Sequence, residues 1–194
     1  MFAKIAERIT ENMEDNHIIK HDDRELYVYG FNQGLNILLN LITTLVVGLL
    51  FRNILELAIF IAAYIPLRSF AGGYHAKTPL RCYIYSIIML ILVSVGMKYL
   101  LFVDMVYYVI LAISALIIFV LSPVEDKNKP LDKIEIKVYR KRLLLIMLNE
   151  LIICVVFKAL DINKLFISIV YALFVMSIVL LIGIIKNKIM KITP

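Results

Sequence analysis

Six apolar runs decide what this chain can fold into. Each run is rich in Ile, Leu and Val and is bounded by polar or charged residues. A helix needs about 20 apolar residues to cross a bilayer, and lipid offers no hydrogen-bond partner to an unpaired backbone group. The sequence therefore predicts an all-α, polytopic membrane protein with about six transmembrane helices, at residues 33–51, 54–67, 83–103, 105–122, 143–160 and 165–185.

The composition favours one membrane domain over a soluble one. Hydrophobic residues make up 62% of the 194 residues, whereas a soluble domain is roughly 45–50% apolar. The start of the chain has no apolar core and no cleavage site, so we expect no signal peptide to be removed. We treat residues 1–194 as a single membrane domain, with an amphipathic segment at 1–31 and a helical bundle at 33–185. The bundle contains a polar loop at 68–82 and a basic loop at 123–142.

An amphipathic helix is predicted at the start of the chain. Phe2, Ile5, Ala6, Ile9 and Met13 share one helical face, and the charged residues lie elsewhere. This pattern suits a helix lying in the membrane interface. It equally suits a short helix packed on the cytoplasmic loops.

Lysine and arginine alternate between the segments that join the apolar runs. Of the 21 Lys and Arg residues, only Arg52, Lys98, Lys158 and Lys164 fall in one alternate set of segments, and the others fall in the opposite set. Because positive charge concentrates on the cytoplasmic side, we predict a multi-pass protein of the cell membrane with both termini and residues 68–82 in the cytoplasm. The net charge of +6 is then a topology signal, and we expect no nucleic-acid partner.

The run at 54–67 is the weak point of that topology. Its helix would span only about 21 Å at about 1.5 Å per residue, against about 30 Å of hydrocarbon. The run therefore thins the bilayer, borrows flanking residues, or re-enters on the same side.

The polar loop has the sequence RSFAGGYHAKTPLRC and contains one of the two cysteines of the chain. Thr78 followed by Pro79 predicts the start of a helix, because Thr is a favoured N-cap and Pro a favoured first residue. Cys82 then lies about one turn into that helix. The helix N-terminus and the neighbouring Arg81 both favour thiolate over thiol.

A histidine precedes this cysteine in the same loop. Gly72 and Gly73 allow a tight reversal, because glycine tolerates positive φ, and a reversal would fold the His75 imidazole back over the helix start. A histidine beside a cysteine is the minimal pair for an activated thiol nucleophile. The alternative is an interfacial histidine and an inert thiol, as free cysteines often are.

Other polar residues give weaker signals. Glu150 lies near the middle of its run, where a carboxyl is costly, and it is either functional or hydrogen-bonded to a neighbouring helix. Cys154 has no histidine nearby and is expected to be a packed thiol. His17 and His21 lie in a charged segment and do not make a metal site on their own. We expect no metal and no other cofactor.

The chain resembles the AgrB family, the membrane endopeptidases of the accessory gene regulator quorum-sensing system in Gram-positive bacteria. The resemblance covers most of the chain and rests on the amphipathic N-terminal segment, the stretch RSFAGGYHA at 68–76, the cysteine at 82, and the basic segment at 122–130. It implies a cysteine peptidase that removes the acidic tail of an AgrD-type propeptide and closes a thiolactone or lactone ring. In such a family Cys82 would attack the peptide bond, and His75 would act as general base and then as acid.

The resemblance also implies substrate-binding residues and partners. Arg68 and Gly73 match family positions linked to activity, as do Lys127 and Lys129 in the basic loop. Arg68 is expected to bind substrate carboxylates or steady an oxyanion, and the two lysines to hold the acidic tail. The expected partners are the propeptide, the lipid bilayer and a second copy, in a homodimer associating through polar residues of the first span. A small transporter or a non-enzymatic membrane scaffold, with Glu150 at its functional core, is the alternative function.

Overall fold

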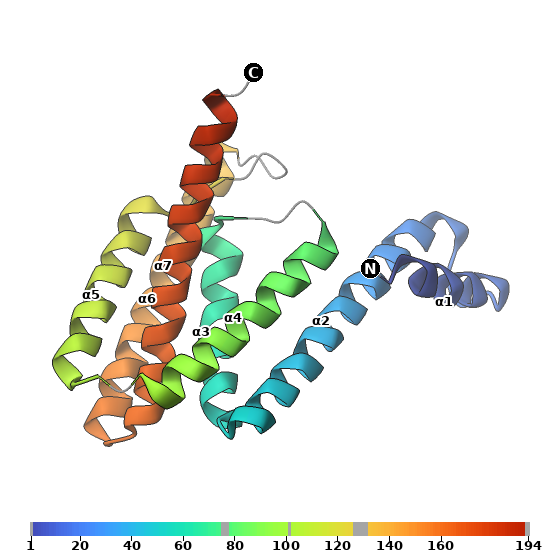
Figure 1. Cartoon of the computed structure of the whole chain (residues 1–194). Coiled ribbons are helices and arrows are strands. Elements are labelled where there is room, and N and C mark those ends of the chain that lie inside the picture. The colour runs from blue at the N-terminus through green and yellow to red at the C-terminus, as the bar shows by residue number, and fades with distance from the viewer. Residues whose placement is uncertain (1, 75–77, 101, 126–131, 193–194) are drawn as a thin grey trace.

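Helices make up the secondary structure of this chain (Figure 1). The structure, a computed structural model, describes residues 2–74, 78–100, 102–125 and 132–192. Within these ranges the chain forms seven α-helices and one short 3-10 helix. Their bounds are α1 (Ala3–Asp15), η1 (His21–Asp23), α2 (Arg24–Phe51), α3 (Ile54–Ala71), α4 (Pro79–Tyr99), α5 (Asp104–Leu121), α6 (Lys133–Ala159) and α7 (Asn163–Ile192).

Five of the described helices are long and apolar enough to cross a membrane, namely α2, α3, α4, α5 and α7. They correspond to five of the six predicted runs, which confirms an all-α membrane protein, although α4 ends at Tyr99, before the predicted end at residue 103. The sixth run lies in α6, which does not reach the same threshold. Because α6 ends at Ala159, an 18-residue window over its apolar part includes three charged residues, Arg142, Glu150 and Lys158. The N-terminal part of α6 is formed by charged residues of the predicted basic loop.

The short run at 54–67 is lengthened by residues of the polar loop. α3 continues through Arg68 to Ala71 and has 18 residues, which span about 27 Å at about 1.5 Å per residue. Leu67 and Ala71 are fully buried, so packing holds the helix to its last residue. Of the three alternatives for this run, the structure therefore favours the use of flanking residues.

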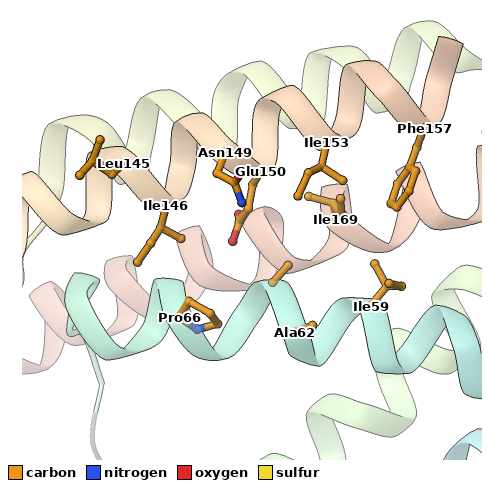
Figure 2. A pocket seen from close by; sticks show the side chains of 11 residues that line it. Ile59, Ala62, Pro66, Leu145, Ile146, Asn149, Glu150, Ile153, Phe157 and Ile169 are labelled. Atoms are coloured by element: carbon orange, nitrogen blue, oxygen red, sulfur yellow. The ribbon is translucent and has the colours of Figure 1, made fainter.

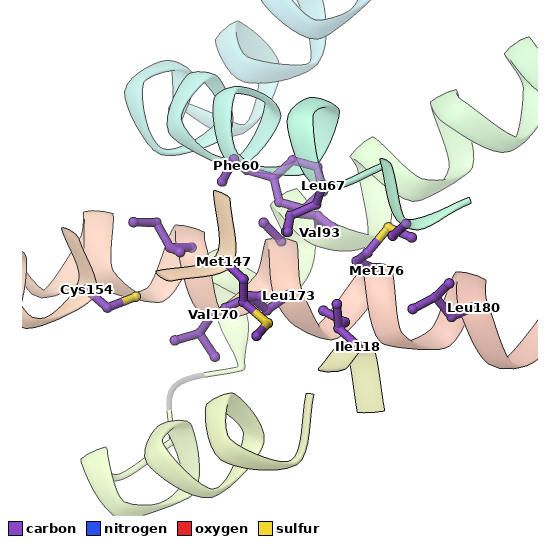
Figure 3. Close-up of a cluster of buried hydrophobic side chains, with 14 of the residues drawn as sticks. Phe60, Leu67, Val93, Ile118, Met147, Cys154, Val170, Leu173, Met176 and Leu180 are labelled. Atoms are coloured by element: carbon purple, nitrogen blue, oxygen red, sulfur yellow. The ribbon is translucent and has the colours of Figure 1, made fainter. Parts of the chain in front are cut away.

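α7 forms the centre of the bundle. Half of the residues in its apolar window are buried, against 11% in α2, and α3, α5 and α6 pack around it. The buried cluster in Figure 3 joins Leu173 and Met176 of α7 to Phe60 of α3, Ile118 of α5 and Met147 of α6. In lipid, such contacts stabilise the bundle by close packing rather than by removing apolar surface from water.

α2 and α4 stand to one side of this core (Figure 1). α4 packs mainly against α2, and α1 packs on α2 near its N-terminal end. The Thr43 Oγ1 of α2 lies 2.7 Å from the Tyr83 hydroxyl of α4, so one polar residue of the first span joins two helices. Ala6 and Thr10 of α1 are buried, which places the amphipathic helix on the helix that follows it.

The polar loop, the basic loop and the last part of α7 meet at one end of the bundle. Gly72 and Val124 form an isolated parallel β-bridge, and Asn187 of α7 donates from its Nδ2 to the Glu125 carbonyl at 2.6 Å. Segments predicted to share one side of the membrane therefore lie together. α3 runs the length of the bundle to reach them, as Figure 1 shows.

Candidate active site

The first turn of α4 contains the predicted nucleophile. Thr78 is the N-cap, its Oγ1 accepts a hydrogen bond from the Arg81 amide at 3.3 Å, and Pro79 occupies the start of the helix. The Cys82 amide donates to the Thr78 carbonyl at 3.1 Å, which confirms the predicted helix start. Cys82 is exposed, so its thiol is open to a molecule arriving from outside the bundle.

Two glycines reverse the chain after α3. The φ angle is 74° at Gly72 and 101° at Gly73, so both residues adopt the positive φ that glycine tolerates, and the return of the chain over the helix start stays a prediction. The Gly73 amide donates to the Val124 carbonyl at 3.2 Å. A Cβ added at Gly72 would lie 2.1 Å from that same carbonyl oxygen. Only glycine fits at this position, because a side chain would overlap the backbone of the basic loop and the φ is left-handed.

The residue after the two glycines rests on α7. The Tyr74 amide donates to the Val179 carbonyl at 3.2 Å, and a Cβ added at Gly183 would lie 2.7 Å from the Tyr74 nitrogen. The lack of a side chain at Gly183 therefore allows the polar loop to approach α7. Sequence reasoning missed this contact, although a single glycine in an apolar helix is a signal of close backbone approach.

Arg68 holds the polar loop from the last turn of α3. Its guanidinium donates from Nη1 to the Gly72 carbonyl and from Nη2 to the Tyr74 carbonyl. The planar fork of arginine suits two acceptors at a set separation. These bonds give Arg68 a role in shaping the loop. Its binding of substrate stays a prediction.

Tyr74 also joins the polar loop to α4. Its ring lies edge-on to the ring of Tyr85, with centroids 5.8 Å apart, and Tyr85 is about one helical turn beyond Cys82. His75 lies outside the described residues. Its chain neighbour thus contacts α4 within one turn of the predicted nucleophile.

Tyr64 is a second residue near Cys82 that sequence reasoning did not single out. It lies on α3, one turn before Arg68, and stacks on Phe60 with ring centroids 5.6 Å apart. It interacts electrostatically with both Arg68 and Cys82. The sequence does not mark Tyr64 as a residue near the candidate site, because aromatic residues are common in apolar runs.

Cations border the polar loop. The Lys186 Nζ of α7 lies 5.0 Å from the centre of the Tyr74 ring, and the Arg142 guanidinium of α6 lies 5.5 Å from the Phe70 ring. Such cation–π contacts place positive charge at the same end of the bundle as Cys82. Lys186 was not among the predicted site residues.

The basic loop begins and ends beside this site. Lys127 and Lys129 lie outside the described residues. The loop leaves the β-bridge at Val124 and enters α6 at Asp132, whose side chain accepts a hydrogen bond from the Ile134 amide at 2.7 Å. Glu135 Oε2 accepts one from the Asp132 amide at 3.0 Å. This reciprocal capping box sets where α6 begins.

The other candidate residues lie away from the polar loop. The His21 Nδ1 is 2.5 Å from Glu14 Oε1. This hydrogen bond raises the pKa of His21 and lowers the pKa of Glu14. Cys154 is 2% exposed and lies in the apolar core, as predicted. In the part of the chain that the structure describes, no three His, Cys, Asp or Glu side chains are grouped to hold a metal ion.

The fold and this site define a class of protein: an all-α membrane protein whose cysteine-bearing polar loop is gathered against the end of its helical bundle. The chain belongs to the AgrB family, described as accessory gene regulator B, which matches residues 4–189.

Relatives with similar names match part of the chain. A protein of Clostridium perfringens (strain SM101 / Type A) named "Putative AgrB-like protein" is 29% identical over 138 residues, which are 68% of this chain and 64% of the relative. "Putative AgrB-like protein 2" of Clostridium perfringens (strain 13 / Type A) is 28% identical with the same coverage. The chain therefore spans slightly less than two thirds of these relatives. No solved structure matches it.

Proposed function

We propose that this protein is a cysteine endopeptidase embedded in the membrane. Its substrate is an AgrD-type propeptide, from which it removes the acidic C-terminal tail and promotes closure of a thiolactone or lactone ring. The observation that carries the proposal is the exposed thiol of Cys82 in the capped first turn of α4. His75 directly follows Tyr74, which packs on both α4 and α7, and we assign it the role of general base.

In the first step, Cys82 is acylated. His75 takes the thiol proton, and the Cys82 Sγ attacks the carbonyl carbon of the peptide bond that joins the core to the acidic tail. The carbon–nitrogen bond breaks, and His75 returns the proton to the departing amine. The tail leaves with a new amino terminus, and the leader and core stay bound as a thioester on Cys82.

In the second step, the ring closes. The thiol or hydroxyl of the substrate's own Cys or Ser attacks the thioester carbonyl, and its proton passes through His75 to the Cys82 Sγ as the old carbon–sulfur bond breaks. No water is consumed, so the ring product and the tail together account for every atom of the propeptide. Exchange of one thioester for another is nearly balanced in energy. Departure of the tail or export of the ring product therefore has to draw the reaction forward.

The charge of the site suits an acidic tail. Lys186 and Arg142 border the polar loop, and Lys127 and Lys129 belong to the segment that leaves the β-bridge beside Gly72. Hydrogen bonds between such cations and carboxylates are roughly twice as strong as neutral ones. The amphipathic leader would lie in the membrane interface beside α1.

We place this end of the bundle, with both chain termini, on the cytoplasmic side of the cell membrane. The polar loop, the basic loop and the end of α7 lie together, and these segments contain most of the lysine and arginine outside the N-terminal segment. The positive-inside rule then sets their side.

A trapped acyl-enzyme would test the proposal. The protein in lipid vesicles is given an AgrD-type propeptide whose ring-forming Cys or Ser is replaced by Ala. We expect tail release together with an adduct on Cys82, seen by intact mass, that hydroxylamine removes. In Cys82→Ser the hydroxylamine-labile adduct should be absent. Equal tail release by wild type and Cys82→Ser, with no adduct in either, would contradict the mechanism.

A further inference from the structure

A groove between α3 and α6 lies apart from the candidate active site (Figure 2). It has a volume of about 450 Å³, and Ile169 of α7 contributes to its wall. Ligand sites typically occupy roughly 300–1,000 Å³ and are mostly apolar with a few converging polar groups. None of the described residues of the polar loop lines this groove.

The groove contains a buried carboxyl. Glu150 is 4% exposed, and among the described residues its Oε2 has no hydrogen-bond partner. It lies midway between Arg142 and Lys158, about 12 Å along the helix from each at about 1.5 Å per residue. A buried acceptor without a donor is costly, and hydrocarbon at this depth supplies none.

Polar groups from both helices line the groove. Pro66 lies inside α3 and has no N–H, so the carbonyl of Ala62, one turn earlier, loses its normal helical donor. Both residues line the groove. Figure 2 shows Asn149 and Glu150 projecting from α6 toward this part of α3. The unpartnered carboxyl of Glu150 is therefore the acidic group of a groove whose other lining residues are mostly apolar.

We propose that this groove binds a primary alkylammonium, that is, a protonated amine at the end of a single apolar chain. An ammonium group has N–H donors and no acceptor, so it can donate to the unpartnered Glu150 Oε2, and its positive charge complements a carboxylate there. The apolar chain would lie along Ile153 and Phe157 or along Ile146, which extend the groove in the two directions. The occupant is a small amphiphile dissolved in the membrane rather than a second protein.

Binding of matched amphiphiles tests the proposal. The purified full-length protein in a maltoside detergent is titrated with n-dodecylamine, n-dodecyltrimethylammonium and n-dodecanol, and bound ligand is counted by native mass spectrometry. We expect the amine to bind at least about tenfold more tightly than either other compound, because charged hydrogen bonds are each worth about tenfold or more. The trimethylammonium compound has the same charge but no N–H, and the alcohol has one donor and no charge.

Two variants locate the site. Glu150→Gln should weaken amine binding by at least about tenfold. Glu56→Gln should leave it unchanged, because Glu56 lies at the start of α3, 3.8 Å from Lys164, outside the groove. Equal binding of the three amphiphiles by wild type would overturn the proposal even if Glu150→Gln does not fold. Binding of a lysine-bearing apolar helical peptide, without binding of dodecylamine, would mean a protein partner and would also overturn it.

Discussion

The two cysteines of this protein lie in opposite surroundings. Cys82 is exposed in the first turn of α4, at the end of the bundle where the polar and basic loops meet. Cys154 is 2% exposed and lies in the C-terminal part of α6 among the core side chains of Figure 3. A thiol becomes a nucleophile where it can ionise and where substrate can reach it. The place of a cysteine along its helix, more than the residue type, therefore separates a candidate nucleophile from a packing residue.

Loss of the proposed general base should cause the largest decrease in tail cleavage. We expect His75→Ala to lower tail cleavage by at least about 10³-fold, because members of a nucleophile–base unit act together. Cleavage of the propeptide in vesicles, followed by mass spectrometry, measures this. His17→Ala is the matched control and should cleave normally. Normal cleavage by well-inserted His75→Ala protein would remove the base from the mechanism.

A methyl group at Gly72 should also lower tail cleavage strongly. In Gly72→Ala the new Cβ would lie 2.1 Å from the Val124 oxygen at a φ of 74°. Strain and overlap of about 3 kcal/mol should lower cleavage roughly 100-fold. Gly30→Ala is the control, because nothing lies within 4 Å of a Cβ at Gly30. Equal activity of the two variants would show that the reversal does not position the site.

Removal of the Arg68 side chain should have a somewhat smaller effect. Arg68→Ala loses two charged hydrogen bonds to loop carbonyls, and we expect kcat to fall about 10- to 100-fold with little change in KM. Arg68→Lys should recover only part of this, because an ammonium lacks the planar fork. Steady-state kinetics separates the two possible roles of Arg68, which are shaping the polar loop and binding the substrate. A rise in KM at unchanged kcat would mean that Arg68 mainly binds substrate.

Substitution of Cys154 should have the smallest effect on cleavage. Cys154→Ala removes one buried sulfur atom, so we expect about 1 kcal/mol of lost stability and cleavage within about twofold of wild type. Thermal unfolding and the same cleavage assay measure the two quantities. If Cys154→Ala abolished cleavage while Cys82→Ser did not, the assignment of the two cysteines would be reversed.

Local chemistry explains which parts of the fold could be predicted. The helix start at Thr78 and Pro79 and the positive φ at Gly72 and Gly73 depend on adjacent residues, and the structure has both. The full length of α3 was not predicted, because Arg68 and Ser69 looked like the beginning of a loop. Buried packing at Leu67 and Ala71 carries the helix through them.

Contacts between distant segments could not be predicted from the sequence. The apolar runs are hydrophobic on all faces, so their periodicity does not say which helix packs on which. The central place of α7, the pairing of α4 with α2, and the approach of Tyr74 to Gly183 depend on side-chain shape across the bundle. The part of the site contributed by α7, including Lys186, was missed for the same reason.

Intact mass spectrometry of the peptide product tests the central claim most directly. Membranes containing this protein and an AgrD-type propeptide are compared with membranes containing Cys82→Ser and the same propeptide, at equal insertion of the protein. We predict a wild-type product that has lost its tail and is lighter by one water than the linear hydrolysed form, and that is absent with Cys82→Ser. The same ring product in both samples would contradict the account, because the ring would then form without the Cys82 thiol.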